Sequence, residues 1–378
     1  MISLCMIVKD EAESLERCLL SVRPAVAEMV VLDTGSRDAT PELARALGAQ
    51  VFFSDFDRDF GRNFGRARNF ALEQATQPWI LVLDADEELH PSDLGRLARL
   101  AGRGGADAYR LWRYNYMGNG WSLHLLARLF RNHPRIRFSH RMHESVEPAV
   151  SALGGRIAEA TVAIHHYGFL KPLARQEARD RWYARAEEEE LKQRPGDTIL
   201  RLLLAERYAR LGETERALAL CREARERDPG QVWGYIVEVQ VRLRAGIQSG
   251  VEELHRRALE VLAPRDRMRR LVLNSLGKVA LEAGRPGEAL RLFLEAERYD
   301  PGRAHLCVNR GLALERLGRR GPARREFLRA LRLNPMLARH PPGMCPEVER
   351  SYRAEAETAA GFFGVFHHLV RARYGRGG

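Results

Sequence analysis

One stretch of the chain, WILVLDADEEL at residues 79–89, carries most of the information about its architecture. Five apolar residues run unbroken through 79–83, and a run so short and rich in β-forming side chains predicts a strand buried on both faces, as in a parallel sheet. Four acids follow within five residues. Asp84 and Asp86 leave an extended chain on the same side, and such oxygen ligands suit Mg²⁺ or Mn²⁺ holding a diphosphate. The alternative is a helix N-terminus that favours acids, with Pro91 opening the helix.

Strands and helices alternate around this stretch. We predict strands at 2–8, 29–32 and 51–53. We predict helices at 13–22, 40–47 and 66–75, and a loop at 55–65. This alternation predicts βαβ units and a parallel sheet, whose ligands bind beyond the carboxyl ends of the strands. After a helix near 93–100 the pattern changes to a mixed, partly antiparallel addition. Its predicted strands are 108–117, 125–131, 136–138, 157–158 and 162–164, with a turn at 118–120.

The second half of the chain has a period of 34 residues. Small residues, an aromatic residue and a proline recur at equal positions in repeats that start at 270 and 304, and a weaker copy starts at 198. In the last repeat they are Gly311, Gly318, Ala323, Phe327, Ala330 and Pro335. Small residues let two antiparallel helices pack closely, and proline stops the second helix, which is the tetratricopeptide pattern. Residues 231–267 predict a degenerate repeat with an insertion, and 180–192 a joining helix.

These patterns predict four parts: an α/β domain at 1–170, a linking helix at 171–196, tetratricopeptide repeats at 197–346, and a closing helix and tail at 347–378. Residues 1–170 hold 20 Lys and Arg against 21 Asp and Glu, and the remainder holds 41 against 29. The basic half indicates either an acidic partner, such as an anionic membrane surface, or a solvated helical array. No motif indicates nucleic-acid binding.

The composition favours a reducing compartment. The five cysteines are scattered, and no pair has the spacing of a zinc site. No apolar run approaches 18 residues, so no membrane-spanning helix is expected. The apolar N-terminus predicts a first strand rather than a signal peptide, because no basic region precedes it. We therefore expect a cytoplasmic protein, either free or peripheral to the inner face of the membrane.

Four segments together resemble family 2 glycosyltransferases of the GT-A fold, in a bacterial subgroup with C-terminal tetratricopeptide repeats. They are LCMIVKDE (4–11), VLDTGSRDAT (31–40), ARNFAL (67–72) and LDADE (83–87). The resemblance implies a GT-A, Rossmann-like mixed sheet followed by an all-α tetratricopeptide solenoid. It also implies an inverting transfer from a nucleotide-sugar, most often a UDP-sugar, with a divalent metal. The match weakens between 100 and 170, where the acceptor is chosen.

The resemblance implies a role for residues around the nucleotide. Val8, Lys9 and Glu11 would line the base pocket, and Asp33 would accept an N–H of the base. The alternative for Asp33 is a turn-forming carboxylate. Arg68 would meet the nucleotide, and its alternative is a solvent-facing arginine on a helix.

The metal site follows from the same resemblance. Asp84 and Asp86 form the family's DxD motif, in which Asp84 would lie near the ribose and a metal-bound water, and Asp86 would bind Mn²⁺ or Mg²⁺ directly. His166 would be a further metal ligand and would favour Mn²⁺. His165 is the competing ligand, and a packed histidine is the alternative for both.

Inverting transfer also needs a general base. Glu144 is the candidate, and His143 would share its role or orient the donor. The Glu-Asp pair of commoner members is missing, so the base stays open, with Asp107 and the acids after Asp86 next to test. Four aromatic residues either stack on sugars or belong to the core: Trp112, Tyr114, Tyr116 and Trp121.

The function expected from these features is glycosyl transfer to a peptide or protein held by the repeats. The alternative is a catalytically inactive scaffold that binds a nucleotide-sugar. A nucleotidyltransferase is a third class, but no glycine-rich phosphate loop follows the first strand.

Overall fold

The computed structural model describes residues 1–103, 105–117, 120–338, 344–346 and 348. The described residues divide into two compact units, 1–171 with 344–346 and 348, and 172–338. Residues 344–346, which we expected at the end of the repeats, thus group with the first unit. Apart from Val348, the predicted closing helix and tail lie outside the described residues.

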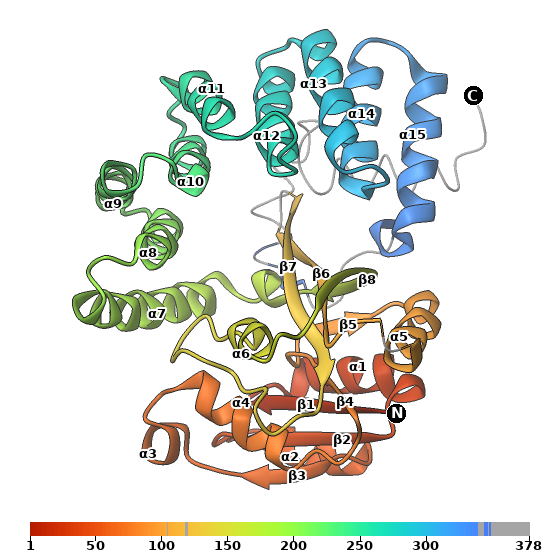
Figure 1. The fold of residues 1–378 in the computed structure, drawn as a ribbon. Helices are drawn as coiled ribbons and strands as arrows, with labels where there is room; N and C mark the ends of the chain where they lie inside the picture. The colour runs from red at the N-terminus through yellow and green to blue at the C-terminus, as the bar shows by residue number, and fades with distance from the viewer. Residues whose placement is uncertain (104, 118–119, 339–343, 347, 349–378) are drawn as a thin grey trace. The chain divides into compact units, whose positions relative to one another are not determined.

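The first unit is built on one eight-stranded sheet in the order β3-β2-β1-β4-β7-β6-β8-β5 (Figure 1). Its strands are β1 (Ile2–Val8), β2 (Glu28–Asp33), β3 (Gln50–Phe53), β4 (Trp79–Val82), β5 (Glu87–Leu89), β6 (Ala108–Met117), β7 (Gly120–Arg131) and β8 (Ile157–His166). The strands β3, β2, β1 and β4 are parallel, and β7 joins β4 antiparallel. The predicted parallel sheet with a mixed addition is confirmed.

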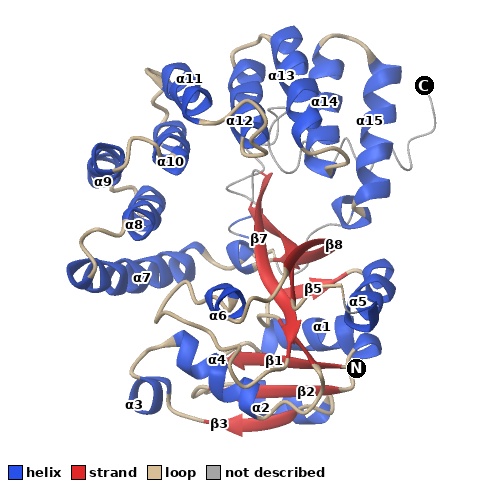
Figure 2. Cartoon of the chain, in the orientation of Figure 1, coloured by secondary structure: helices blue, strands red, loops and turns tan. Residues whose placement is uncertain are grey.

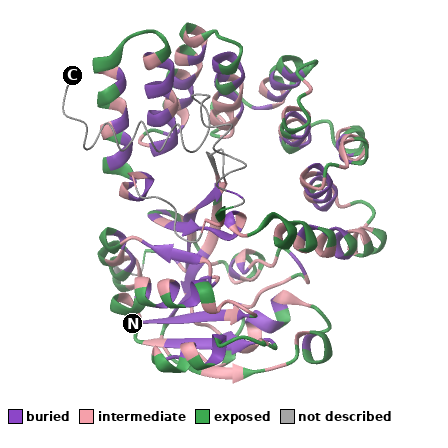
Figure 3. Cartoon of the chain, turned by 180° about the vertical axis from the view of Figure 1, so that it is seen from behind, coloured by how far each residue is buried: buried purple, intermediate pink, exposed green. Residues whose placement is uncertain are grey.

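Helices cover both faces of the parallel half (Figure 2). They are α1 (Ala12–Val22), α2 (Thr40–Ala46), α3 (Phe56–Phe60), α4 (Phe64–Glu73), α5 (Pro91–Arg103) and α6 (Glu147–Ala152), with short 3-10 turns η1 (Arg23–Ala25) and η2 (Gly168–Leu170). Leu4 and Met6 of β1 pack with α1, α2 and α5, whereas Cys5 packs with α3, α4 and α6. Both faces of β1, β2 and β4 are therefore buried, as the apolar runs predict, whereas the edge strand β3 is partly exposed (Figure 3).

Three predicted elements differ from the structure. The loop at 55–65 contains α3, because the Asp55 carboxylate accepts the Arg58 N–H at 2.8 Å and caps a helix there. The strand at 136–138 is wrong: the Asn69 side chain, not a neighbouring strand, bonds the backbone N–H and C=O of Phe138 at 2.7 and 3.0 Å. The segments 157–158 and 162–164 form one strand, β8, with a register shift.

The sheet curls where the acidic stretch lies. Only residues 83–86 separate β4 from β5, yet the two strands are far apart in the sheet order. Strand β5 pairs antiparallel with the end of β8, with Glu87 opposite His166. This connection brings the end of β8 beside the acids that follow β4.

The second unit is helical throughout its described residues. It consists of α7 (Leu173–Gln193), α8 (Thr198–Arg210), α9 (Thr214–Arg227), α10 (Val232–Arg244), α11 (Val251–Val261), α12 (Arg269–Glu282), α13 (Pro286–Tyr299), α14 (Ala304–Arg316), α15 (Arg320–Leu333) and the 3-10 turn η3 (Pro335–Ala338). Paired helices follow one another through this unit, as the 34-residue period predicts (Figure 1). A Cβ at Gly277 would lie 2.5 Å from the Phe293 ring, so the pair α12–α13 packs closely because position 277 has no side chain. Among the described helices, not one has both the length and the apolar character that a membrane crossing requires.

Candidate functional site

Asp33 ends β2 at the carboxyl edge of the sheet and is buried. Its Oδ1 accepts the N–H groups of Gly35 and Ser36 at 2.9 and 2.8 Å, which is the turn-forming role. Its Oδ2 is also buried, and no described group donates to it. A buried acceptor without a donor costs free energy, so this oxygen suits an N–H of a ligand. The two predicted roles of Asp33 thus use different oxygens and are compatible.

The loop after β1 is bonded to the loop after β2. The Asp10 N–H donates to Ser36 Oγ at 2.9 Å, and the Glu11 N–H donates to Thr40 Oγ1 at 2.8 Å. These bonds hold the predicted rim of the base pocket in place. The predicted lining residues differ in exposure: Val8 is buried, Lys9 is exposed and Glu11 is half-buried.

Arg68 of α4 is buried against the acids that follow β4. Its Nη2 donates to Asp84 Oδ1 at 2.7 Å, and its Nε donates to Glu144 Oε1 at 2.6 Å. The side chain is 9% exposed, so the alternative of a solvent-facing arginine is wrong. Its Nη1 is buried and has no acceptor among the described residues. One guanidinium therefore joins the candidate base to the DxD motif and keeps one N–H group for a ligand.

Two further arginines, which sequence analysis missed, complete this cluster. Arg128 of β7 places Nη2 3.0 Å from Asp84 Oδ2 and 3.4 Å from Glu87 Oε1, and Arg113 of β6 places Nε 3.0 Å from the same Glu87 oxygen. Burial alone would raise the pKa of Asp84, but Arg68 and Arg128 outweigh burial and hold that pKa well below its usual range. The sequence could have indicated these two residues, because each is a charged residue inside a strand of mainly apolar residues. Arginine is seldom buried without a partner, so such a position predicts a buried ion pair.

Asp86 and His166 face each other where β5 meets β8. Asp86 Oδ1 lies 3.5 Å from His166 Nε2, and both side chains are largely buried. Gly168 packs directly against both side chains: a Cβ at this position would lie 2.4 Å from Asp86 Oδ2 and 2.6 Å from His166 Nε2, so a larger residue would displace them. The chain thus holds together one oxygen and one nitrogen of the kind that bind metals.

His166 is held in the form that a metal ligand needs. Its Nδ1 lies 2.8 Å from Asn115 Oδ1, an acceptor, so Nδ1 carries the hydrogen. Asn115 Nδ2 donates to Ser122 Oγ at 3.1 Å, which orients the amide. Burial, and then the charge of Arg113, lower the pKa of His166. The Nε2 atom of the ring faces Asp86 Oδ1 at 3.5 Å.

His165 points away from Asp86. Its Nδ1 lies 2.8 Å from the Tyr116 hydroxyl, and its ring stacks with Tyr114 at a centroid distance of 5.7 Å. The side chain is fully buried. Of the two candidate histidines, only His166 lies beside the acid.

Other candidates are structural. Trp112, Tyr114 and Tyr116 are at most 7% exposed, so they belong to the core rather than to an open stacking surface, and the side chain of Trp121 lies outside the described residues. The Asp107 carboxylate accepts the Arg156 N–H at 2.9 Å. That bond gives Asp107 a role in joining β6 to β8.

Glu144 and His143 lie in a loop that closes through a bridge between Ser139 and Ser145. The Glu144 side chain is 15% exposed and faces Arg68. His143 is exposed and has a φ of 52°, in the left-handed region. Adjacent residues thus take opposite sides of the loop, and the carboxylate is the one directed at the acidic cluster.

The geometry supplies part of a metal site. Within the described ranges, no three His, Cys, Asp or Glu side chains converge in a way that would hold a metal ion alone. Asp86 and His166, packed against Gly168, fit a shared site in which the protein would supply two ligands and a diphosphate and water would supply the rest, as is usual for Mg²⁺ beside substrate phosphates. Burial opposes ionisation of Asp86, but His166 and Lys171 outweigh it and lower the pKa of Asp86 well below its usual range.

Lys171 is an unpredicted member of the site. Its Nζ donates to both carboxylate oxygens of Glu11, at 2.6 and 2.7 Å, and lies 3.5 Å from Asp86 Oδ2. Lys171 thereby joins the loop after β1 to the end of β4. Its partner Glu11 is 160 positions away in the chain, and no motif indicated the contact.

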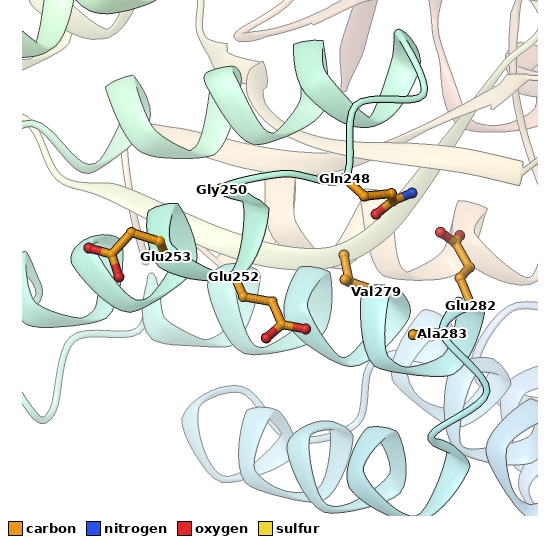
Figure 4. A pocket seen from close by; sticks show the side chains of 7 residues that line it. All are labelled: Gln248, Gly250, Glu252, Glu253, Val279, Glu282 and Ala283. Atoms are coloured by element: carbon orange, nitrogen blue, oxygen red, sulfur yellow. The ribbon is translucent and has the colours of Figure 1, made fainter.

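A separate pocket of about 570 Å³ lies on the second unit, between α11 and α12 (Figure 4). None of the predicted site residues lines it. Its lining residues are Gln248, Gly250, Glu252, Glu253, Val279, Glu282 and Ala283.

Comparison with known proteins agrees with the two-unit architecture. Residues 3–158 match the family model described as glycosyl transferase family 2. A TPR repeat-containing protein of Synechococcus elongatus is 41% identical over 198 residues, which cover 51% of this chain and 46% of that protein. The lipopolysaccharide core biosynthesis glycosyltransferase LpsC of Rhizobium meliloti is 32% identical over 144 residues, 36% of this chain and 50% of that protein. The chain thus spans at most half the length of these two relatives.

Among solved structures, a thermophilic TPR protein of Thermus thermophilus is 18% identical, over 48% of this chain and 92% of that chain, with a TM-score of 0.37. The repeat assignment here rests on the helix pairs and their 34-residue period. The expected resemblance to family 2 glycosyltransferases is confirmed for the first unit, and the family match supports a role in glycosyl transfer.

Proposed function

We propose that the family 2 glycosyl transferase domain in residues 3–158 moves a sugar from a nucleotide-sugar, a UDP-sugar in the first instance, to an acceptor, with inversion at the anomeric carbon. One observation carries the proposal. Two buried polar atoms with no described partner, Asp33 Oδ2 and Arg68 Nη1, belong to elements at the ligand-binding edge of the sheet. A carboxylate oxygen suits the N–H of a pyrimidine base, and a guanidinium suits a phosphate.

In this proposal Asp86 and His166 would hold Mn²⁺ or Mg²⁺ beside the donor diphosphate. Such a metal would supply positive charge to offset the negative charge of the leaving nucleoside diphosphate. Asp84 is already bonded to Arg68 and Arg128, so its main task is to position these guanidiniums beside the diphosphate. Asp86 is the acid of the DxD motif that faces His166.

Glu144 is proposed as the general base. It would take the proton from the acceptor nucleophile as that atom attacks the anomeric carbon. Its bond to Arg68 holds the carboxylate in one orientation, next to the donor side of the site. His143, on the outer side of the same loop, would orient donor or acceptor.

The acceptor is proposed to be a peptide or protein held by the repeats, because helix-pair arrays bind extended partners. A saccharide is the second candidate, since the relative LpsC is named for lipopolysaccharide core biosynthesis. The proposed location is the cytoplasm, where the basic second half would also allow contact with an anionic membrane face.

A thermal-shift screen of nucleotide-sugars with Mn²⁺ and Mg²⁺ tests the donor assignment, because a ligand that binds the folded state raises the melting temperature. UDP release from UDP-glucose and UDP-N-acetylglucosamine, with and without peptide or glycan acceptors, then tests the enzyme. An inactive scaffold would be stabilised by a donor and release no UDP. A nucleotidyltransferase would instead release pyrophosphate when supplied with UTP and a sugar 1-phosphate.

A further inference from the structure

The Lys171 ammonium lies beside Asp86, the acid proposed to bind the metal ion. It lies 2.6 and 2.7 Å from the two oxygens of Glu11 and 3.5 Å from Asp86 Oδ2. The side chains of Lys171, Glu11 and Asp86 are 16%, 19% and 13% exposed, so water screens their charges weakly. Gly168 packs against the same Asp86 oxygen, and a Cβ there would lie 2.4 Å from Oδ2.

The acids at this point differ in their partners. Asp84 has two guanidinium partners, Arg68 and Arg128. Asp86 and Glu11 are instead bridged by the Lys171 ammonium. An ion bound by Asp86 would therefore lie a few ångströms from Lys171, where like charges in a buried site repel strongly.

We infer that Lys171 couples metal binding to donor binding: its ammonium disfavours a divalent ion at Asp86 until a nucleoside diphosphate brings the negative charge that both cations need. The inference rests on the proposed function, because it takes Asp86 as a metal ligand. A diphosphate contributes two or more negative charges, which can be shared between the metal and the ammonium. Metal and nucleotide then bind cooperatively, and by thermodynamic linkage each raises the affinity of the protein for the other by the same factor.

The test measures Mn²⁺ affinity from the electron paramagnetic resonance signal of the free ion, with the full chain, in the presence and absence of UDP. For the wild type we expect UDP to tighten Mn²⁺ binding by about 10- to 100-fold, within the usual range of coupling between sites. Lys171→Met should bind Mn²⁺ about tenfold more tightly than the wild type without UDP, because a repelling charge is gone. Its coupling to UDP should shrink by the same factor.

Matched variants separate charge from shape. Lys171→Arg keeps the charge and should keep most of the coupling. Lys192→Met removes a positive charge from an exposed position on α7 and should leave Mn²⁺ affinity unchanged. Should Lys171→Met lower the melting temperature, Lys171→Gln gives the same measurement with a side chain that can still bond Glu11.

The outcomes distinguish the inference from the function on which it rests. Equal Mn²⁺ affinity in the wild type, Lys171→Met and Lys171→Gln without UDP would overturn the role of Lys171, while the Asp86 site would stand. Absence of Mn²⁺ binding in all of them, with or without UDP, would overturn the proposed metal site together with the inference.

Discussion

Acidic side chains gather at two places in this protein, and the two groups are built in opposite ways. At the sheet edge, Asp84, Asp86 and Glu87 are largely buried, and their cationic partners come from α4, β6, β7 and the segment after β8. In the repeat pocket, Glu252 and Glu253 are exposed. Their partners are surface arginines, among them residues one helical turn away at 256 and 257.

The difference teaches where function is to be sought. Surface ion pairs contribute about 0–1 kcal/mol each, so the acids of the repeat pocket can be explained as ordinary solvated pairs. Buried charges need several partners, and removal of one partner typically costs about 3–5 kcal/mol. A cluster maintained against that cost, with buried polar atoms nearby that have no partner among the described residues, is the better candidate for chemistry.

Removal of one acid from each group should give the greatest contrast. Asp86→Asn should lower transfer by about 10³-fold or more and abolish Mn²⁺-dependent stabilisation by UDP, because the change removes the charged metal ligand. Glu253→Gln, in the repeat pocket, should do neither. Turnover with Mn²⁺ and the UDP-induced melting shift on both variants measure the contrast. Wild-type turnover of Asp86→Asn would refute the DxD assignment.

The base assignment is tested within the sheet-edge group. Glu144→Gln should lower transfer by about 10²- to 10⁴-fold, the usual effect of losing a general base. Donor-induced stabilisation should persist, because the amide can still bond Arg68. His143→Ala should lose less. If Glu144→Gln turns over normally while His143→Ala is inactive, the histidine is the base; if both are near normal, the base lies elsewhere, and the acids after Asp86 are the next to test.

Two glycine substitutions compare a tightly packed glycine at the sheet edge with an open one in the repeat unit. Gly168→Ala should weaken Mn²⁺ binding by about 10- to 100-fold, because its Cβ would lie 2.4 Å from Asp86 Oδ2, and displaced ligands typically cost that much affinity. Gly287→Ala, on α13 with nothing within 4 Å of the new Cβ, should leave Mn²⁺ binding unchanged. It should also stabilise the repeats by up to about 1 kcal/mol. Calorimetric Mn²⁺ titration and thermal melts report both effects.

The stability of the repeat unit should depend on pH through a buried histidine, His305. Burial, followed by the charges of Arg270 and Arg303, lowers the pKa of His305 from 6.5 to about 3. The unfolded chain therefore takes up a proton below about pH 6.5 that the folded unit refuses, and stability is lost as the pH falls toward 3. Between pH 7 and 5 the loss should be about 2 kcal/mol. His305→Gln should remove this component, seen as a smaller fall in the repeat-unit melting transition.

Local patterns predicted much of the fold. The apolar run at 79–83 became β4 and the first residue beyond it, and the 34-residue period became successive helix pairs. Both depend on contacts within a few residues or between neighbouring helices. The failures lie where a long-range contact replaced a local rule, as at 136–138, where the side chain of Asn69 supplies the bonds that a strand partner would have made.

The candidate site was predicted in its parts and not in its connections. Asp33, Arg68, Asp84 and Asp86 were named from their motifs, and the structure places Arg68 and Asp84 in direct contact. Which histidine faces Asp86 could not be known from adjacent letters. It depends on the pairing of β5 with β8, which turns His166 toward the acid and His165 toward Tyr116.

The identity of the acids, their spacing and the strand that carries them are properties of a few consecutive residues, so they are visible in the printed sequence. The partners of those acids are not. Arg113, Arg128 and Lys171 reach them from strands and segments far along the chain, because the sheet curls and brings the end of β8 beside the end of β4. Charges act through space, and the distances between these groups exist only once the chain has folded.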